Sequence, residues 1–221
     1  MALADRPKKP LLPLKASQLR INRHTAACRY LMAADPIMHR LIERIGPCEL
    51  VPRRGAFALL CHAIISQQLS IAAATTIFDR LTRLYPNRRL KPEAVAATSI
   101  PALRAAGLSV SKARYIHDLA QGFLDGRIRP RGFSTQSNEE IIATLTNVKG
   151  IGRWTVEMFL IFSLNRPDVL PVDDLGIRQS VQRWYRFQTP PTARELQRIA
   201  APWHPFESIA SWYLWKARRL P

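Results

Sequence analysis

Helical spacing of apolar residues is the feature that most constrains the fold of this 221-residue chain. After Ser17, apolar side chains recur about every three to four residues through most of the sequence. Runs in which apolar and polar residues alternate, which are typical of strands, are missing. The clearest helical series consists of Ile71, Ala74, Ile77, Phe78, Leu81 and Leu84. The pattern therefore predicts an all-α fold of about ten short helices.

Capping residues divide this pattern into segments. Ser17 predicts a helix that runs to about Ala34, and Asp35 followed by proline predicts the start of the next one. Ser137 and Glu140 have the spacing of a capping box. Further helices are predicted at about 56–69, 71–84, 91–98, 100–106, 111–124, 138–146, 153–163, 173–185, 192–201 and 205–218.

The charge balance indicates a polyanionic partner. The chain has 33 Lys and Arg against 16 Asp and Glu, which gives a formal net charge of +17. Nucleic acid is the first candidate, because cations that neutralise phosphates release counterions. An anionic membrane surface and a ribosomal location are the alternatives. The basic residues are spread along the chain, however, and membrane targeting usually needs a compact polybasic block.

Several classes are excluded by what the sequence lacks. The longest apolar run, at residues 56–65, is far shorter than the ~20 residues that span a bilayer. The N-terminal segment, residues 1–15, has no apolar core of a secretory signal and is predicted to be a flexible basic tail, either solvated or in contact with DNA. Three scattered cysteines predict neither a disulfide framework nor a metal cluster. We expect an intracellular protein of the cytoplasm or nucleoid.

The segment LTNVKGIGRWTVEMF, residues 145–159, predicts a helix, a tight turn and a second helix. Gly150 and Gly152 allow positive φ and close backbone approach, and Ile151 between them would anchor the turn in the core. The free N–H groups at the start of the second helix can bind a phosphate oxygen. A plain turn between packed helices has the same pattern, but the flanking cations favour DNA. The predicted contacts are Lys149, Gly150, Gly152, Arg153 and Thr155.

Two adjacent carboxylates follow an apolar stretch that contains proline, at Asp173 and Asp174. One of them can cap the next helix, where the helix dipole stabilises its charge. The other can face a cleft as an ionised group that stabilises a cation or activates water. Capping by both is the alternative. The residues alone do not decide which of the two carboxylates takes which role.

Together these elements resemble the helix-hairpin-helix DNA glycosylases, and within them the DNA-3-methyladenine glycosylase II group. The resemblance extends over roughly residues 56–215. It rests on five blocks: IISQQLS at 64–70, GLSVSKARYI at 107–116, VKGIGRWT at 148–155, the Asp173–Asp174 pair, and WHPFESIA at 203–210 with Trp215 beyond it.

The resemblance implies roles for individual residues. Asp174 matches the catalytic aspartate, so Asp173 is expected to be a helix cap or a loop brace. Gln68 matches the side chain that fills the space left by a flipped base. Trp154 stands where bifunctional relatives have lysine, so a monofunctional enzyme without lyase activity is implied. Trp215 matches a tryptophan of the base pocket. Met158 and Leu175 stand where some members have pocket tyrosines, so the pocket is expected to be less aromatic.

The resemblance also bears on ions and cofactors. Backbone carbonyls of Thr146, Val148 and Ile151 match those that hold a monovalent cation, Na⁺ or K⁺, at the hairpin. The cysteines of the iron–sulfur relatives have no counterpart, and no cofactor is expected to be required. His62, His117 and His204 lack the spacing of metal ligands.

The implied architecture has two helical subdomains with the catalytic residue in the cleft between them. Residues 56–164 form one subdomain that ends in the helix-hairpin-helix, and residues 16–55 plus 165–221 form the other. The implied function is base excision repair of alkylation damage: a monomer that binds double-stranded DNA, flips a damaged nucleotide and hydrolyses the N-glycosidic bond of an alkylated purine. A non-catalytic DNA-binding module of the same fold, and a glycosylase for deaminated or oxidised bases, are the alternatives.

Overall fold

The described part of the chain is entirely helical apart from its loops. The computed structural model describes the backbone of residues 16–221 and the side chains from residue 24 onward, except residue 71. The predicted tail at residues 1–15 lies outside the described residues. Over the described range there are twelve α-helices, three short 3₁₀ helices and no strand. The all-α prediction is confirmed, and the twelve α-helices correspond to the twelve segments predicted above, two more than the round figure of about ten.

The α-helices are α1 (Ala16–Ala34), α2 (Pro36–Ile45), α3 (Ala56–Ser66), α4 (Ile71–Arg83), α5 (Pro92–Ala96), α6 (Ile100–Ala105), α7 (Val110–Leu124), α8 (Asn138–Thr146), α9 (Arg153–Phe162), α10 (Leu175–Trp184), α11 (Ala193–Ala200) and α12 (Glu207–Ala217). The 3₁₀ helices are η1 (Pro86–Arg88), η2 (Pro130–Ser134) and η3 (Ala201–Trp203). No helix in the described part of the chain is both long enough and apolar enough to cross a membrane.

Most helix ends follow from local capping. Asp35 accepts hydrogen bonds from the first N–H groups of α2, and Ser137 with Glu140 forms the predicted capping box at α8. Several predicted ends differ from the structure by a few residues. Helix α3 ends at Ser66, because the backbone of Gln67 already leaves the helical conformation, and α7 is capped by Ser109. Helix α12 begins at Glu207 instead of near 205.

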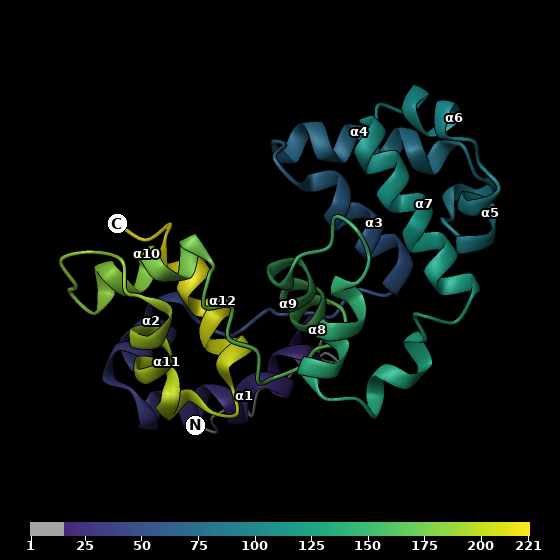
Figure 1. Ribbon diagram of the computed structural model, residues 1–221. Helices are drawn as coiled ribbons and strands as arrows, with labels where there is room; N and C mark the ends of the chain where they lie inside the picture. The colour runs from purple at the N-terminus through teal and green to yellow at the C-terminus, as the bar shows by residue number, and fades with distance from the viewer. Residues whose placement is uncertain (1–15) are drawn as a thin grey trace, which may run out of the picture.

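The helices pack in two groups (Figure 1). Helices α1, α2, α10 and α12 pack on one another, with α11 beside η3 in the same group. In the second group α3 packs on α4 and α7, and α7 also packs on α5 and α6. Helices α8 and α9 form a pair that contacts the second group through α3. The chain thus passes from the first group to the second and back.

A buried carboxylate joins distant segments of the first group. Oδ2 of Asp35 accepts hydrogen bonds from the Tyr185 hydroxyl at 2.6 Å and from Nε1 of Trp203 at 2.8 Å. Its other oxygen caps α2. Burial and the neighbouring Asp35 raise the pKa of Tyr185 far above its ordinary value. A buried carboxylate with this many donors is satisfied, so it serves the packing of these helices.

Candidate active site

The predicted hairpin joins α8 to α9. Gly150 has a φ of +85°, and its Cα lies under the ring of Tyr115 so closely that a Cβ could not be placed there. Ile151 is buried, as predicted. Gly152 differs from the prediction, because its φ is −91° and a Cβ there would meet nothing within 4 Å. The space on the Cβ side of Gly152 is empty, which leaves room for a ligand at the start of α9.

Of the two cations that flank the hairpin turn, one is exposed and the other is paired with carboxylates. Lys149 is exposed at the turn. Arg153 donates to Glu139 through both terminal nitrogens, at 3.0 Å for Nη1, and its Nε donates to Glu157 at 3.1 Å. The hydrogen bonds from Arg153 lower the pKa of Glu139, whereas burial raises the pKa of Glu157. Two carboxylates thus engage the guanidinium that the sequence assigned to DNA.

The carbonyls proposed for a monovalent cation lie in the same turn. The Val148 carbonyl accepts the N–H of Ile151 at 3.0 Å. The carbonyl oxygens of Thr146 and Ile151 accept no turn hydrogen bond from the described backbone. Carbonyl oxygens are the ligands that such a cation requires, and two of the three predicted ones, those of Thr146 and Ile151, are free of turn hydrogen bonds. The cation itself stays a prediction.

Asp174 is the best-connected carboxylate near this hairpin. It is 8% exposed and stands at the N-cap of α10, where Oδ1 accepts the N–H of Ile177 at 2.8 Å. Oδ1 also accepts Nε1 of Trp215 at 3.0 Å, and Oδ2 accepts Nε1 of Trp154 at 2.8 Å. Of the two roles expected of Asp173, that of helix cap was wrong, because Asp173 is exposed and the cap is Asp174 itself. The role of loop brace stays a prediction.

The indoles of Trp154 and Trp215, which are far apart in the sequence, thus both donate a hydrogen bond to the carboxylate of Asp174. Trp154 belongs to the first turn of α9 and is 47% exposed, so about half of this residue is accessible to a ligand. Trp215 belongs to α12 and stacks on Phe162 with ring centroids 5.6 Å apart and planes 29° apart. Leu175 follows the carboxylate and is 61% exposed. Of these side chains, only Phe162 was not singled out by the sequence.

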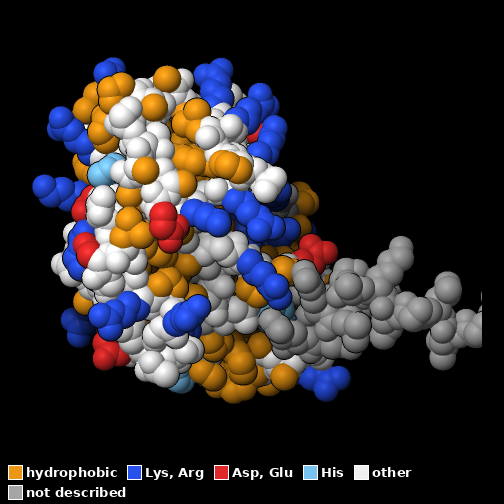
Figure 2. Space-filling view, turned by 90° about the vertical axis from the view of Figure 1, so that its right-hand side faces the viewer, with side chains coloured by type: hydrophobic (Ala, Val, Ile, Leu, Met, Phe, Trp, Pro, Cys, Tyr) orange, Lys and Arg blue, Asp and Glu red, His pale blue; other side chains and the backbone are white. Residues whose placement is uncertain are grey.

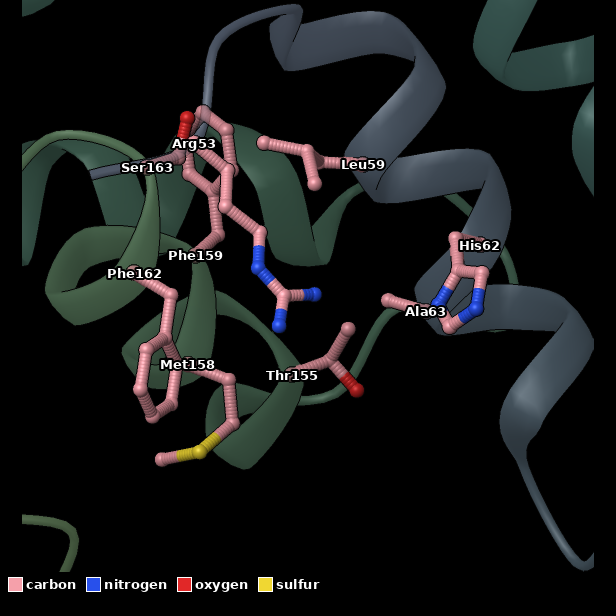
Figure 3. Close-up of a pocket in the computed structure, with 9 residues that line it drawn as sticks. All are labelled: Arg53, Leu59, His62, Ala63, Thr155, Met158, Phe159, Phe162 and Ser163. Carbon is pink, nitrogen blue, oxygen red and sulfur yellow. The ribbon is translucent and has the colours of Figure 1, made fainter. Parts of the chain in front are cut away.

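A cavity of about 220 Å³ lies beside this group (Figure 3). Residues of α3 and α9, one residue of the loop before α3 and the residue that follows α9 line it: Arg53, Leu59, His62, Ala63, Thr155, Met158, Phe159, Phe162 and Ser163. The predicted pocket residue Met158 is among them. Thr155, expected at the DNA surface, is 5% exposed and faces this cavity instead. Because Phe162 both lines the cavity and stacks on Trp215, the cavity adjoins the Asp174 cluster.

The loop between α3 and α4 presents Gln68 and Leu69 outward. Gln68 is exposed in a left-handed backbone conformation with φ of +56°, and Leu69 is 39% exposed. The Lys112 ammonium donates to the carbonyls of Ile65 and Gln67, each at 2.7 Å. These bonds hold the base of the loop and leave its tip free.

Sequence reasoning missed Arg53, His62, Gln67 and Phe162. A signal was present for Gln67, which stands in the quoted IISQQLS block beside Gln68. Arg53 and His62 had none, since neither stands in a spacing that indicates a site. On the face drawn in Figure 2, Lys and Arg side chains are spread widely, as their even distribution along the chain predicts.

Comparisons with known proteins agree with this geometry. The family model described as "HhH-GPD superfamily base excision DNA repair protein" matches residues 61–205. DNA-3-methyladenine glycosylase 1 of Schizosaccharomyces pombe is 37% identical over 201 residues, which are 89% of this chain and 88% of that protein. The solved structure of the S. pombe 3-methyladenine DNA glycosylase in complex with abasic DNA matches with a TM-score of 0.78 and 37% identity, over 89% of this chain and 98% of that one.

A second solved structure, a DNA-3-methyladenine glycosidase from Bacillus halodurans, matches with a TM-score of 0.81 and 34% identity. It covers 88% of this chain and 90% of its own. Both the family model and the relatives include the hairpin and the Asp174 segment within the matched span. The chain belongs to the HhH-GPD superfamily of base excision DNA repair proteins.

Proposed function

We propose that this protein is a monofunctional DNA glycosylase that hydrolyses the N-glycosidic bond of alkylated purines, of the 3-methyladenine and 7-methylguanine type, in double-stranded DNA. The observation that carries the proposal is the Asp174 carboxylate held by two indoles beside a base-sized cavity. The names of the similar proteins, 3-methyladenine glycosylases of S. pombe and B. halodurans, support it.

DNA binding is assigned to the hairpin and the α3–α4 loop. The start of α9 offers N–H groups beside the open face of Gly152, and these suit a phosphate oxygen without reading sequence. Lys149 adds an exposed cation, and a monovalent cation on Thr146, Val148 and Ile151 would add further positive charge there. Gln68 at the tip of the loop would enter the duplex where the damaged nucleotide leaves it.

The cavity suits a flipped base. It is smaller than the roughly 300–1,000 Å³ of pockets for drug-sized ligands, as a nucleobase requires. Phe159, Phe162 and Met158 offer apolar walls, and the half-exposed Trp154, next to the lining residue Thr155, would stack on the base. An alkylated purine carries positive charge, and contact with an aromatic face stabilises a cation by roughly 0.5–2 kcal/mol.

The chemical step then needs little beyond electrostatics. When the C1′–N bond breaks, its electron pair leaves with the base, which is a good leaving group because alkylation has made it cationic. The sugar that remains resembles an oxocarbenium ion, which the Asp174 carboxylate stabilises. Water adds its oxygen to C1′ and releases a proton, so the products are the free base and an abasic site.

The same residues support a monofunctional reaction. A lyase step requires an amine that attacks C1′ and forms a Schiff base. Trp154 has no such amine, and no lysine is among the described residues that line the cavity or bond to Asp174. The proposed reaction needs no cofactor, and we place the protein where the cell holds its DNA.

Release of free bases from methylated duplex DNA tests the proposal, with the wild type compared with Asp174→Asn. We expect the wild type to release 3-methyladenine or 7-methylguanine. Asp174→Asn should still bind DNA that contains an abasic site and release bases about 10²–10³ times more slowly. Asp173→Asn is the matched control, because this neighbouring carboxylate is exposed and should leave the rate nearly unchanged.

Failure would also be informative. Binding without release of any alkylated base would contradict the proposed activity, and a panel of deaminated and oxidised bases would then separate another glycosylase from a binding module. Equal rates for Asp174→Asn and the wild type would contradict the role of the carboxylate.

A further inference from the structure

The cavity beside Asp174 contains one guanidinium, that of Arg53 (Figure 3). The backbone N–H of Arg53 donates to the carbonyl of Phe162 at 2.7 Å, which fixes the residue beside the end of α9. In the figure its side chain extends toward Thr155 and Met158, between the wall from α9 and the wall from α3. Arg53 is open to solvent, as a group at the mouth of a pocket would be.

No carboxylate among the residues that line the cavity neutralises the Arg53 charge. None of the nine lining residues is acidic, and the Arg53 guanidinium forms no ion pair with any described side chain. Arg153, at the hairpin, differs in this respect, because it has two carboxylate partners. The N–H donors of Arg53 are therefore available to a ligand.

A guanidinium donates hydrogen bonds and cannot accept them. A purine with a carbonyl at C6 presents an acceptor to it, whereas a purine with an amino group at C6 presents a donor. We infer that Arg53 is a specificity-determining residue of the pocket, which favours release of damaged purines with a carbonyl at C6 over those with an amino group. The inference rests on the proposed glycosylase function and assigns its substrate preference.

Three lesions separate the hydrogen bond of Arg53 from its charge. 7-Methylguanine and 3-methyladenine are both cations in DNA, but only the first has a C6 carbonyl. Repulsion by the guanidinium therefore largely cancels in the ratio of their rates, and the ratio reports the hydrogen bond. Hypoxanthine has the carbonyl and no charge, so its comparison with 7-methylguanine reports the repulsion.

The test measures single-turnover release of each base from duplexes with one lesion, for wild type and Arg53→Met. Methionine keeps an unbranched side chain and removes both the charge and the donors. Lesions differ in intrinsic lability, so each variant is compared with the wild type on the same lesion. Arg54→Met is the matched control, because Arg54 is the next residue, also exposed, and does not line the cavity.

We expect Arg53→Met to lower the rate ratio of 7-methylguanine to 3-methyladenine roughly tenfold, the usual effect of losing a hydrogen bond from a charged donor. Release of hypoxanthine should fall by at least as much as that of 7-methylguanine. Arg54→Met should leave both ratios unchanged. If the wild type releases no hypoxanthine, the ratio for the two methylated bases alone decides.

Two results would overturn the inference. An equal loss of rate on all three lesions, together with weaker binding of undamaged duplex, would mean that Arg53 binds a phosphate. Unchanged ratios in Arg53→Met would mean that the side chain does not contact the base. Both differ from failure of the proposed function, in which the wild type itself releases neither methylated base.

Discussion

The side-chain amide of Gln67 donates a hydrogen bond of 2.6 Å to the carbonyl oxygen of Gly150, across 83 positions of sequence. The backbone carbonyl of Gln67 in turn accepts a hydrogen bond from the Lys112 ammonium. Burial lowers the pKa of this lysine, so its bonds to carbonyls replace lost hydration. The loop that carries Gln68 and the turn of the hairpin are thereby held as one unit.

Gln67→Leu tests this link. Leucine keeps a similar volume and removes the donor, so we expect the affinity for damaged duplex to fall about two- to tenfold, the usual effect of one hydrogen bond. The melting temperature should change little. Gln197→Leu, on an exposed face of α11, is the control for loss of a glutamine. Equal affinities of Gln67→Leu and the wild type would show that the loop and the hairpin act separately.

The two hairpin glycines should respond differently to alanine. Gly150→Ala places a Cβ against the Tyr115 ring at a positive φ, and we expect a loss of about 2 kcal/mol or more in the free energy of unfolding. Gly152→Ala meets nothing within the protein, so its unfolding free energy should stay within about 0.5 kcal/mol of the wild type. Its affinity for duplex DNA should nevertheless fall. Denaturant unfolding and DNA titration distinguish the two, and a normal DNA affinity for Gly152→Ala would contradict phosphate binding at that face.

Trp154→Phe removes the indole N–H that Asp174 accepts and keeps an aromatic ring. A hydrogen bond to a charged group contributes roughly 1.5–3 kcal/mol, so we expect base release to slow by at least about tenfold. Stability should change little, because Trp154 is half exposed. The interaction is checked by a double-mutant cycle of single-turnover rates: in an Asp174→Asn background, Trp154→Phe should have a much smaller effect. Additive effects would mean that the indole acts on the base and not through the carboxylate.

His62 gives a pH signature of the cavity. Burial first, and the Arg53 charge second, lower the pKa of His62 from its ordinary value of 6.5. The unfolded chain then binds more protons than the native one, so the free energy of unfolding should decrease as the pH falls from about 6.5 toward the native pKa. Proton NMR titration should place the His62 midpoint below 6.5, and Arg53→Met should raise it. An unchanged His62 midpoint in Arg53→Met would show that the Arg53 charge does not affect the pKa of His62.

Helices and the hairpin were predictable because their causes are local. Proline, a cap and apolar spacing act within one or two turns, so Asp35 and the capping box at Ser137 could be placed from the sequence. The resemblance placed Asp174 among the site candidates. It could not show which aspartate caps α10, since both have the same side-chain chemistry and only the folded backbone places Asp174, and not Asp173, at the N–H of Ile177.

Tertiary contacts decided which cations are free. Arg153 and Lys149 look alike beside the Gly-Ile-Gly turn, but Glu139 of α8 pairs with the first and leaves the second exposed. In the same way Arg53 was one basic residue among many until the backbone bond to Phe162 placed it at the cavity. The partner of a charged residue cannot be predicted from the sequence alone, because an ion pair depends on the distance between two side chains in the folded chain.

The sequence by itself therefore determined an all-helical protein with a hairpin and a carboxylate after it, because hydrophobic periodicity and caps are properties of neighbouring residues. Only the tertiary structure decided the site. It brings the indoles of Trp154 and Trp215, 20 and 41 positions from Asp174, onto one carboxylate. The cavity beside them exists because α3 and α9 pack at a particular place, and packing of distant helices is set by the whole core.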